Sequence, residues 1–338
     1  HNYYLEILTD LGVVGLLILS IIFFAIFYSS FIKKYFFSSE LKENHLIEII
    51  LFALGITTGI YGVLVGAGGG FILAPVLILF FSKDPEVAAG TSLALVSINS
   101  ISGFIAYRKT GFIDVRSGLL FAVAAIPGSV LAPFVLDAMP GNTFRTLFGV
   151  LLLALAVHMF FRRGHREEDT EYSGSEIIFD STFPKWMDFT VKERKIKSSV
   201  GVTFIYKFNE SMAVTFNLIL GFVSSFFGTG GGFLRTPILV SVFSFPIKVA
   251  VATSIFSLSF YATIGAAAHA FNQNIEWYPT LVWGGIGLVL GGQIGARVAQ
   301  RIKSFWILKL LLLVVLFLGV QLVLEGLWPG LINLPEAH

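Results

Sequence analysis

The sequence predicts an all-α polytopic membrane protein: a helical bundle of two internal repeats with glycine-broken helices, plus a small soluble insert with β-strand character. The chain is 55% hydrophobic and only 13% charged, with a mean hydropathy of +0.82, unlike a soluble domain. A glycine-rich segment occurs twice, each time inside a long uncharged stretch. Between the two copies, residues 162–207 carry 17 of the 44 charged residues, so we expect this insert to lie outside the bilayer.

Uncharged stretches of membrane-spanning length follow one another along the chain. About 20 apolar residues cross a bilayer as a helix. Flanking Arg and Lys side chains can reach the interface from shorter stretches. Long stretches lie at residues 11–32, 49–82, 87–107, 117–136, 211–234, 249–275 and 277–296, and shorter ones at 146–161 and 310–324.

These stretches divide the chain into segments. Residues 11–32 follow no basic region and precede no small-residue cleavage pattern, which indicates a retained helix rather than a signal peptide. Alternating apolar residues at 176–179, 188–192 and 200–208 predict strands in the insert. We therefore expect an extra helix and linker (1–45), a first repeat (46–161), the insert (162–207), a second repeat (208–328) and a tail (329–338).

The doubled glycine segment is the main functional signal. Residues 66–75 read GAGGGFILAP, and residues 228–237, 162 positions later, read GTGGGFLRTP. Consecutive glycines and a following proline interrupt a helix, and in a bilayer such a break must be buried in protein or line a cavity. Paired breaks in two halves indicate a transporter's binding site, and free N–H groups at a break suit an anion. The predicted site residues are Gly68, Gly69, Gly70, Gly230, Gly231 and Gly232.

Polar residues recur at the same offset. Thr91 and Ser92 match Thr253 and Ser254, and these hydroxyls, with Asn99, are candidates to complete a ligand's shell. The alternative is that each hydroxyl bonds its own helix or a neighbouring one. Likewise, a single glycine cluster could serve only for close helix packing.

Two titratable side chains lie in the second half. Arg235 stands where the first copy has Leu73, and a cation inside a membrane segment is by default a functional candidate. Its guanidinium geometry suits sulfonate, carboxylate or sulfite oxygens, although an interfacial anchor is the alternative. A histidine ordinarily titrates near physiological pH, so His269 could couple protons to transport, or could be an interfacial hydrogen-bonding residue.

Other chemistry finds little support in the sequence. The chain has no cysteine, and no His-rich or carboxylate cluster indicates a metal. No His, Asp and Ser spacing suggests a hydrolase, so we predict no catalytic residue and no cofactor. The net charge of +2 gives no reason to expect nucleic acid. Gly287, Gly291 and Gly295 predict a close-packing surface, either within the bundle or in a homodimer.

The doubled glycine elements, each followed by a Thr-Ser pair, resemble the sulfite exporter TauE/SafE family over residues 46–328, apart from the insert. The resemblance implies a secondary transporter in the bacterial inner membrane that exports sulfite, sulfoacetate or another organosulfonate. Residues 1–32, from His1 onward, resemble the end of O-antigen ligase or polymerase proteins. Two alternatives therefore stay open, a remnant of a glycan-transferring enzyme and a membrane sensor whose insert binds a partner. Loop charges leave parallel and inverted repeats both open.

Overall fold

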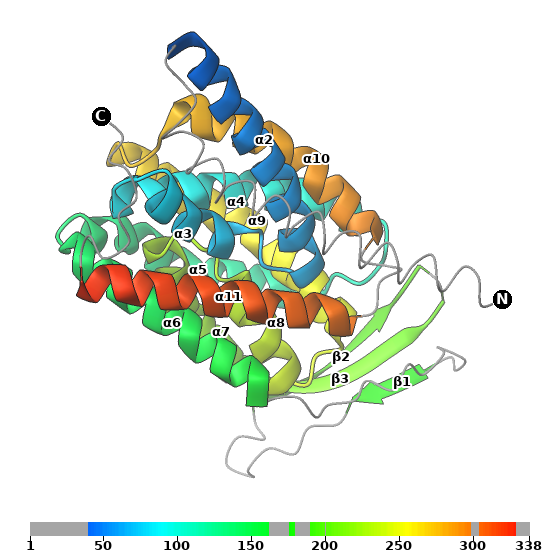
Figure 1. Ribbon diagram of the computed structural model, residues 1–338. Coiled ribbons are helices and arrows are strands. Elements are labelled where there is room, and N and C mark those ends of the chain that lie inside the picture. The colour runs from blue at the N-terminus through cyan, green and yellow to red at the C-terminus, as the bar shows by residue number, and fades with distance from the viewer. Residues whose placement is uncertain (1–39, 162–175, 180–189, 200, 299–303, 329–338) are drawn as a thin grey trace.

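A computed structural model of the chain describes residues 40–161, 176–179, 190–199, 201–298 and 304–328. The helix expected at 11–32 and the tail at 329–338 lie outside the described residues. The described chain is mostly helical, as predicted (Figure 1). Five helices are long and apolar enough to cross a membrane, namely His45–Val65, Pro85–Tyr107, Val115–Leu136, Ile247–Phe271 and Trp277–Val298.

The elements occur in the same order before and after a small sheet. Before it come α2 (Glu40–Val65), α3 (Gly70–Phe80), α4 (Pro85–Tyr107), α5 (Val115–Leu136) and α6 (Gly141–Phe161). The sheet contains β1 (Glu176–Phe179), β2 (Val191–Lys197) and β3 (Thr203–Asn209). After it come α7 (Glu210–Phe226), α8 (Gly232–Ser241), α9 (Ile247–Phe271), η2 (Trp277–Leu281), α10 (Val282–Val298) and α11 (Ser304–Leu327).

The long helices pack in pairs. Helix α2 lies beside α10 and α6 beside α11 (Figure 1), while α5 packs on α7 and α4 on α9. Contacts between α2 and α10 advance in the same direction, from Gly55 against Gly284 to Gly59 against Leu288, so these helices are parallel. Contacts between α4 and α9 run in opposite directions, from Leu93 against Gly265 to Gly103 against Ile255, so these helices are antiparallel.

Small residues explain the closeness of these pairs. The backbones of Gly287, Gly291 and Gly295 lie against the backbone of α2, where a Cβ would meet carbonyl oxygens. The expected packing surface on α10 is therefore used inside the bundle.

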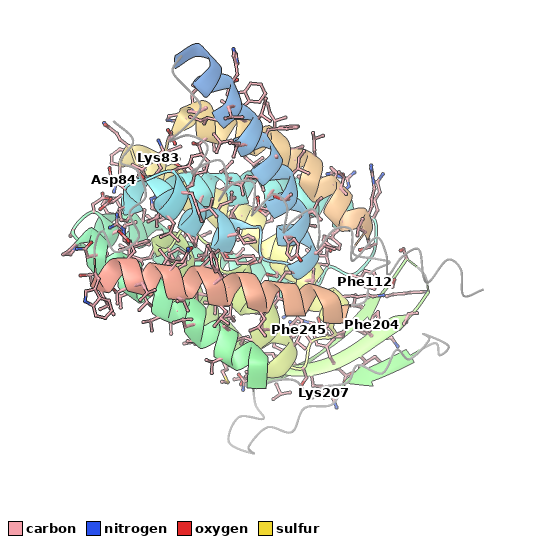
Figure 2. All side chains as sticks on the ribbon, viewed as in Figure 1. Lys83, Asp84, Phe112, Phe204, Lys207 and Phe245 are labelled. Atoms are coloured by element: carbon pink, nitrogen blue, oxygen red, sulfur yellow. The ribbon has the colours of Figure 1, made fainter. Side chains whose placement is uncertain are left out.

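The insert forms a three-stranded sheet of order β1-β3-β2, in which β3 pairs parallel with β1 and antiparallel with β2. Strand β2 lies further along the chain than residues 188–192, where a strand was expected. Alternate residues of β3 (Phe204, Tyr206 and Phe208) are buried against the helices, and the ring centroids of Tyr206 and Phe245 are 4.5 Å apart. Figure 2 shows Phe204 and Phe245 together at this end of the bundle. The sheet is thus docked on the end of the helical bundle.

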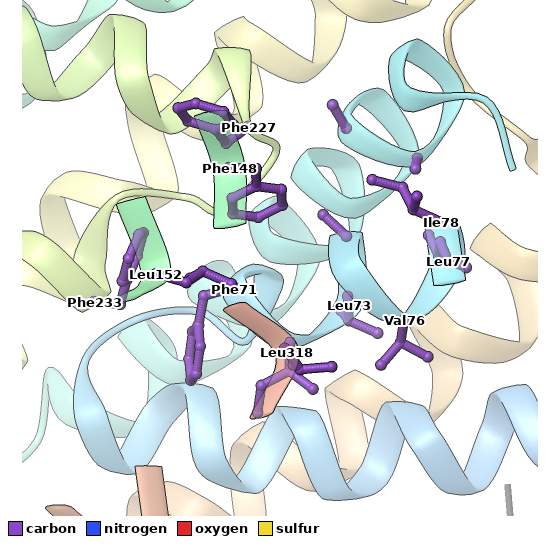
Figure 3. Close-up of a cluster of buried hydrophobic side chains, with 14 of the residues drawn as sticks. Phe71, Leu73, Val76, Leu77, Ile78, Phe148, Leu152, Phe227, Phe233 and Leu318 are labelled. Carbon is purple, nitrogen blue, oxygen red and sulfur yellow. The ribbon is translucent and has the colours of Figure 1, made fainter. Parts of the chain in front are cut away.

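A second apolar cluster surrounds α3. Figure 3 shows Leu73 and Val76 of this helix among aliphatic and aromatic side chains from α6, α11 and the segment after α7. Burial of these apolar side chains stabilises the position of α3 inside the bundle.

Candidate functional site

The two glycine-rich segments form tight turns between helices. We call residues 66–70, which run from the end of α2 to the first residue of α3, the first turn, and residues 228–232, which end at the first residue of α8, the second turn. Non-glycine residues rarely adopt a positive φ, so helix geometry ends here. Positive φ angles of 65° to 90° occur at Gly66, Gly68, Gly69, Gly228, Gly230 and Gly231.

The two turns touch each other through their backbones. A Cβ added at Gly70 would lie 2.5 Å from the carbonyl oxygen of Gly228, and one added at Gly232 would collide with the carbonyl oxygen of Gly66. Just beyond the turns, the rings of Phe71 and Phe233 stack with centroids 5.7 Å apart. Only glycine allows this approach, so these residues place two interrupted helices in contact inside the bundle.

Side chains of α4 and α9 bind the carbonyl groups of the turns. The Asn99 amide donates to the Gly68 carbonyl oxygen at 3.0 Å, and the Tyr261 hydroxyl donates to that of Gly230. Ser92 donates to the carbonyl oxygen of Gly70 at 3.2 Å. Ser254 donates to the carbonyl oxygen of Gly66 at 2.9 Å. Three predicted residues, Asn99, Ser92 and Ser254, therefore lie against the turns.

The other predicted polar residues bond elsewhere. The Thr91 hydroxyl accepts from the backbone N–H of Glu276 at 2.8 Å, and the Thr253 hydroxyl accepts from that of Asp114 at 3.0 Å. His269 is fully buried, with Nε2 3.0 Å from the carbonyl oxygen of Ser225. Its Nδ1 has no hydrogen-bond partner among the described residues. These three side chains bond loop segments and α7 rather than the glycine turns.

Arg235 is fully buried, one helical turn after the second glycine turn. Its Nη1 donates to the Ser257 hydroxyl at 3.0 Å, and its guanidinium carbon lies 4.7 Å from the centre of the Tyr261 ring. Its Nε and Nη2 have no hydrogen-bond partner among the described residues, nor does the buried Ser224 hydroxyl. A Cβ at Gly231 would lie 3.1 Å from the Ser224 hydroxyl and 3.2 Å from that of Tyr261, so both border the second turn.

Three residues of this region, Tyr261, Ser257 and Ser224, are not among the site residues predicted from the sequence. Tyr261 stands 162 positions after Asn99, so applying the repeat offset to Asn99 would have found it. Ser257 and Ser224 stand opposite Leu95 and Gly62 in the first half. The repeat offset does not identify these two serines, because the positions that match them in the first half hold an apolar residue and a glycine.

A buried carboxylate follows α4. Asp114 accepts hydrogen bonds from the Ser117 backbone at 3.0 Å and the Tyr206 hydroxyl at 2.7 Å, and it lies 3.6 Å from Arg194 of the sheet. Burial, and then the charge of Asp114, raise the pKa of Tyr206, so this phenol stays protonated. These bonds fasten the sheet to the bundle.

A matching carboxylate follows α9. Glu276 accepts from Lys83 at 2.6 Å and from the Thr280 hydroxyl at 2.6 Å. Figure 2 places Lys83 at the end of the bundle away from the sheet. The two carboxylates therefore secure opposite ends of the central helices. Within the described ranges, no group of three or more His, Cys, Asp or Glu side chains could hold a metal ion.

Apolar membrane-length helices, interrupted by glycine turns that meet beside a buried cation, define a membrane transport protein. The chain belongs to the TauE/SafE sulfite exporter family, because the family model described as "Sulfite exporter TauE/SafE" matches residues 51–322. The match identifies a multi-pass membrane transporter rather than an enzyme.

Curated relatives are similar over most of their length. The chain is 29% identical over 287 residues to the probable membrane transporter protein YunE of Bacillus subtilis (strain 168), covering 83% of this chain and 98% of that protein. It is 26% identical over 275 residues to a probable membrane transporter protein of Methanocaldococcus jannaschii, covering 77% of this chain and 90% of that protein. No solved structure matches the chain.

Proposed function

We propose that the protein exports a small sulfur-containing anion, such as sulfite, sulfoacetate or another organosulfonate, by alternating access. The anion binds where the two glycine turns meet. The observation that carries this proposal is the buried Arg235 beside the second turn, with two N–H-bearing nitrogens that have no hydrogen-bond partner among the described residues. A buried cation without a partner is costly, and a bound anion would offset that cost. The family description supports a sulfur oxyanion as substrate.

The proposed mechanism needs two equivalent halves of opposite orientation. Contacts exchange between the halves: Thr91 accepts from the backbone of Glu276, while Thr253 accepts from that of Asp114. Helices α4 and α9 occupy matching positions yet run antiparallel. This arrangement favours inverted repeats related by a two-fold axis in the membrane plane, as in many alternating-access transporters.

The predicted site residues have different roles in this proposal. Backbone N–H groups of Gly69, Gly70, Gly230 and Gly232 face the anion. Those of Gly68 and Gly231 donate to the Gly62 carbonyl oxygen at 2.9 Å and the Thr229 hydroxyl at 3.4 Å, so these two glycines shape the turns, which Asn99, Ser92 and Ser254 hold. Thr91 and Thr253 fix the loops that follow the opposite long helix. His269, which is buried and whose Nδ1 has no hydrogen-bond partner in the described part of the chain, is the candidate for proton coupling.

Proteoliposomes loaded with radiolabelled sulfite or sulfoacetate test the proposal. Native protein should release label, and unlabelled anion outside should accelerate release, because a carrier returns faster when loaded. Gly69→Leu and Gly231→Leu should reduce release to the level of empty liposomes. Gly284→Ala is the control, because its Cβ would meet only the Leu95 side chain at ordinary distance. Release that is unchanged in both leucine variants would contradict the central site.

Ser254→Ala provides a gentler variant in case the leucine variants do not fold. It removes one hydrogen bond to the Gly66 carbonyl oxygen and adds no bulk. We expect it to slow release while the protein stays folded. Release that is insensitive to external anion would contradict alternating access.

A further inference from the structure

We propose that Arg235 binds one oxyanion group of the substrate through Nε and Nη2 and that the substrate is a monoanion. The positive charge that binds it lies beside the second turn, and the first turn has no equivalent. The inference rests on the proposed function for the class of substrate. It adds the bonding edge, the residues that orient the guanidinium and the charge state. A single charge favours hydrogensulfite and monosulfonates, among the proposed substrates, over sulfoacetate, which carries two negative charges at neutral pH.

The free atoms of Arg235 form a matched pair. Nε and Nη2 donate from the same edge of the guanidinium plane, and neither has a hydrogen-bond partner among the described residues. Two parallel N–H bonds from one edge fit two oxygens of a single sulfonate, sulfite or carboxylate group. The remaining nitrogen, Nη1, is already bonded to Ser257 at 3.0 Å.

Two residues of α9 fix the orientation of this edge. Ser257 accepts the hydrogen bond from Nη1, and the Tyr261 ring lies 4.7 Å from the guanidinium carbon. Tyr261 is itself held by its hydrogen bond to the Gly230 carbonyl oxygen. Ser257 and Tyr261 are therefore positioning residues, because they fix the orientation of the guanidinium edge that carries Nε and Nη2.

The charge balance selects a monoanion. Two side chains that are ordinarily charged at neutral pH are buried among the described residues, Arg235 and Asp114, and Asp114 pairs with Arg194. Arg235 makes no ion pair within the described part of the chain. One negative charge on the substrate would neutralise it, whereas a second would stay buried and uncompensated.

The first turn does not duplicate this arrangement. Leu73 occupies the position of Arg235, Leu95 that of Ser257, and Gly62 that of Ser224. The Ser224 hydroxyl is buried beside the second turn and has no partner in the described part of the chain, so it can donate to a further substrate oxygen. The anionic group is thus bound on one side of the paired turns, and the rest of the substrate faces the apolar side.

Calorimetric binding to detergent-solubilised full-length protein tests the charge selection. Ethanesulfonate and 1-propanesulfonate should bind at least about tenfold more tightly than 1,2-ethanedisulfonate, because one buried charge would be left unpaired. Equal affinities for the mono- and disulfonates, or an absence of saturable binding, would overturn the proposal.

Variants test the bonding edge. Arg235→Lys keeps the charge but removes the two-bond edge, and it should weaken ethanesulfonate binding about tenfold. Ser257→Ala should lower affinity severalfold and reduce the preference for monosulfonates. Its matched control is Ser259→Ala, because Ser259 bonds only the Phe256 carbonyl of its own helix. Equal effects of the two alanine variants, in proteins with native melting temperatures, would contradict a positioning role.

Flux separates this inference from the proposed function. Selective binding that depends on Arg235, without release of anion from proteoliposomes, would support the site and contradict transport. Release of sulfonate that is unaffected by Arg235→Lys would support transport and contradict the site.

Discussion

The two glycine turns share a backbone design but differ in their side chains. Each turn has left-handed glycines, touches the other turn and is bonded through a glycine carbonyl by a polar side chain, Asn99 or Tyr261. After the first turn, Leu73 lies in the apolar cluster of Figure 3. After the second turn, the matching residue is the buried Arg235, whose Nε and Nη2 have no hydrogen-bond partner within the described ranges. The similar backbones of the two turns therefore allow the turns to pack against each other. The difference in side chains places a cation beside the second turn and an apolar residue after the first.

This difference separates two tasks that a transport site must perform. A structure that moves between two orientations benefits from two similar halves, because each can adopt the other's conformation. Recognition of a small anion needs only one cation, and a second buried charge would add a further desolvation cost. In the proposed site, both needs are met by two similar turns and a single cation beside one of them.

The largest expected effect comes from breaking the shared backbone contact. Gly70→Ala and Gly232→Ala each place a methyl group against a carbonyl oxygen of the other turn. We expect each to lower the free energy of unfolding by about 4 kcal/mol or more, because backbone cannot yield as a side chain can. Thermal unfolding in detergent measures the loss. Gly284→Ala should unfold at the native temperature, and equal stability of all three variants would contradict the contact.

Substitutions at positions 73 and 235 test whether the two turns need different side chains. Leu73→Arg buries a cation in the apolar cluster and should destabilise the protein by about 3–5 kcal/mol. Arg235→Leu should leave the melting temperature unchanged or raise it, because it removes an unpaired buried charge, yet it should abolish anion binding. Thermal unfolding and calorimetry on both variants measure this. Similar destabilisation by the two substitutions would show that Arg235 is stabilised by the protein itself.

Much of this comparison could be predicted from the sequence. The glycine runs, their offset and the contrast between Leu73 and Arg235 are local patterns, and they identified the segments that the structure brings together. Docking of the sheet was not predictable, because the charges of the insert outweighed the alternation of Phe204, Tyr206 and Phe208. Ser224 and Ser257 were missed because nothing local distinguishes a serine near a buried guanidinium from one bonded to its own helix.

The roles of Thr91 and Thr253 also depended on tertiary structure. Each lies next to a serine that binds a turn, but its own hydroxyl accepts from a loop in the other half. Adjacent helix positions point about 100° apart, so a Thr-Ser pair divides between two environments. Sequence alone does not assign the two members of such a pair.

Substituting the carboxylates at the two ends of the bundle should lower the stability by a smaller amount. Asp114→Asn should destabilise the protein by about 2 kcal/mol, because Asp114 is buried and accepts several bonds. Glu276→Gln should cost about 1 kcal/mol or less, because the Lys83 and Glu276 side chains are 32% and 18% exposed and solvent screens their pair. Denaturant unfolding compares the two, and a larger loss for Glu276→Gln would contradict this ranking.

Tyr206→Phe should also have a small effect, about 1 kcal/mol, because it removes one hydrogen bond to Asp114 and keeps the ring packed. Burial raises the pKa of Tyr206 above its ordinary value of 10.0, so the folded state holds the proton more tightly than the unfolded state. Stability should therefore fall as pH rises above about 10, and less so in Tyr206→Phe. Unfolding measured across alkaline pH tests this, and identical profiles would contradict it.

The most direct test locates a bound anion. Crystals of the protein with 2-bromoethanesulfonate allow the bromine to be found by anomalous scattering, and the chain has no cysteine for this reagent to alkylate. The account predicts one sulfonate against Nε and Nη2 of Arg235, with the anomalous peak beside the second turn and its loss in Arg235→Leu. A peak beside the first turn, equal peaks at both turns, or a peak that persists in Arg235→Leu would contradict the account.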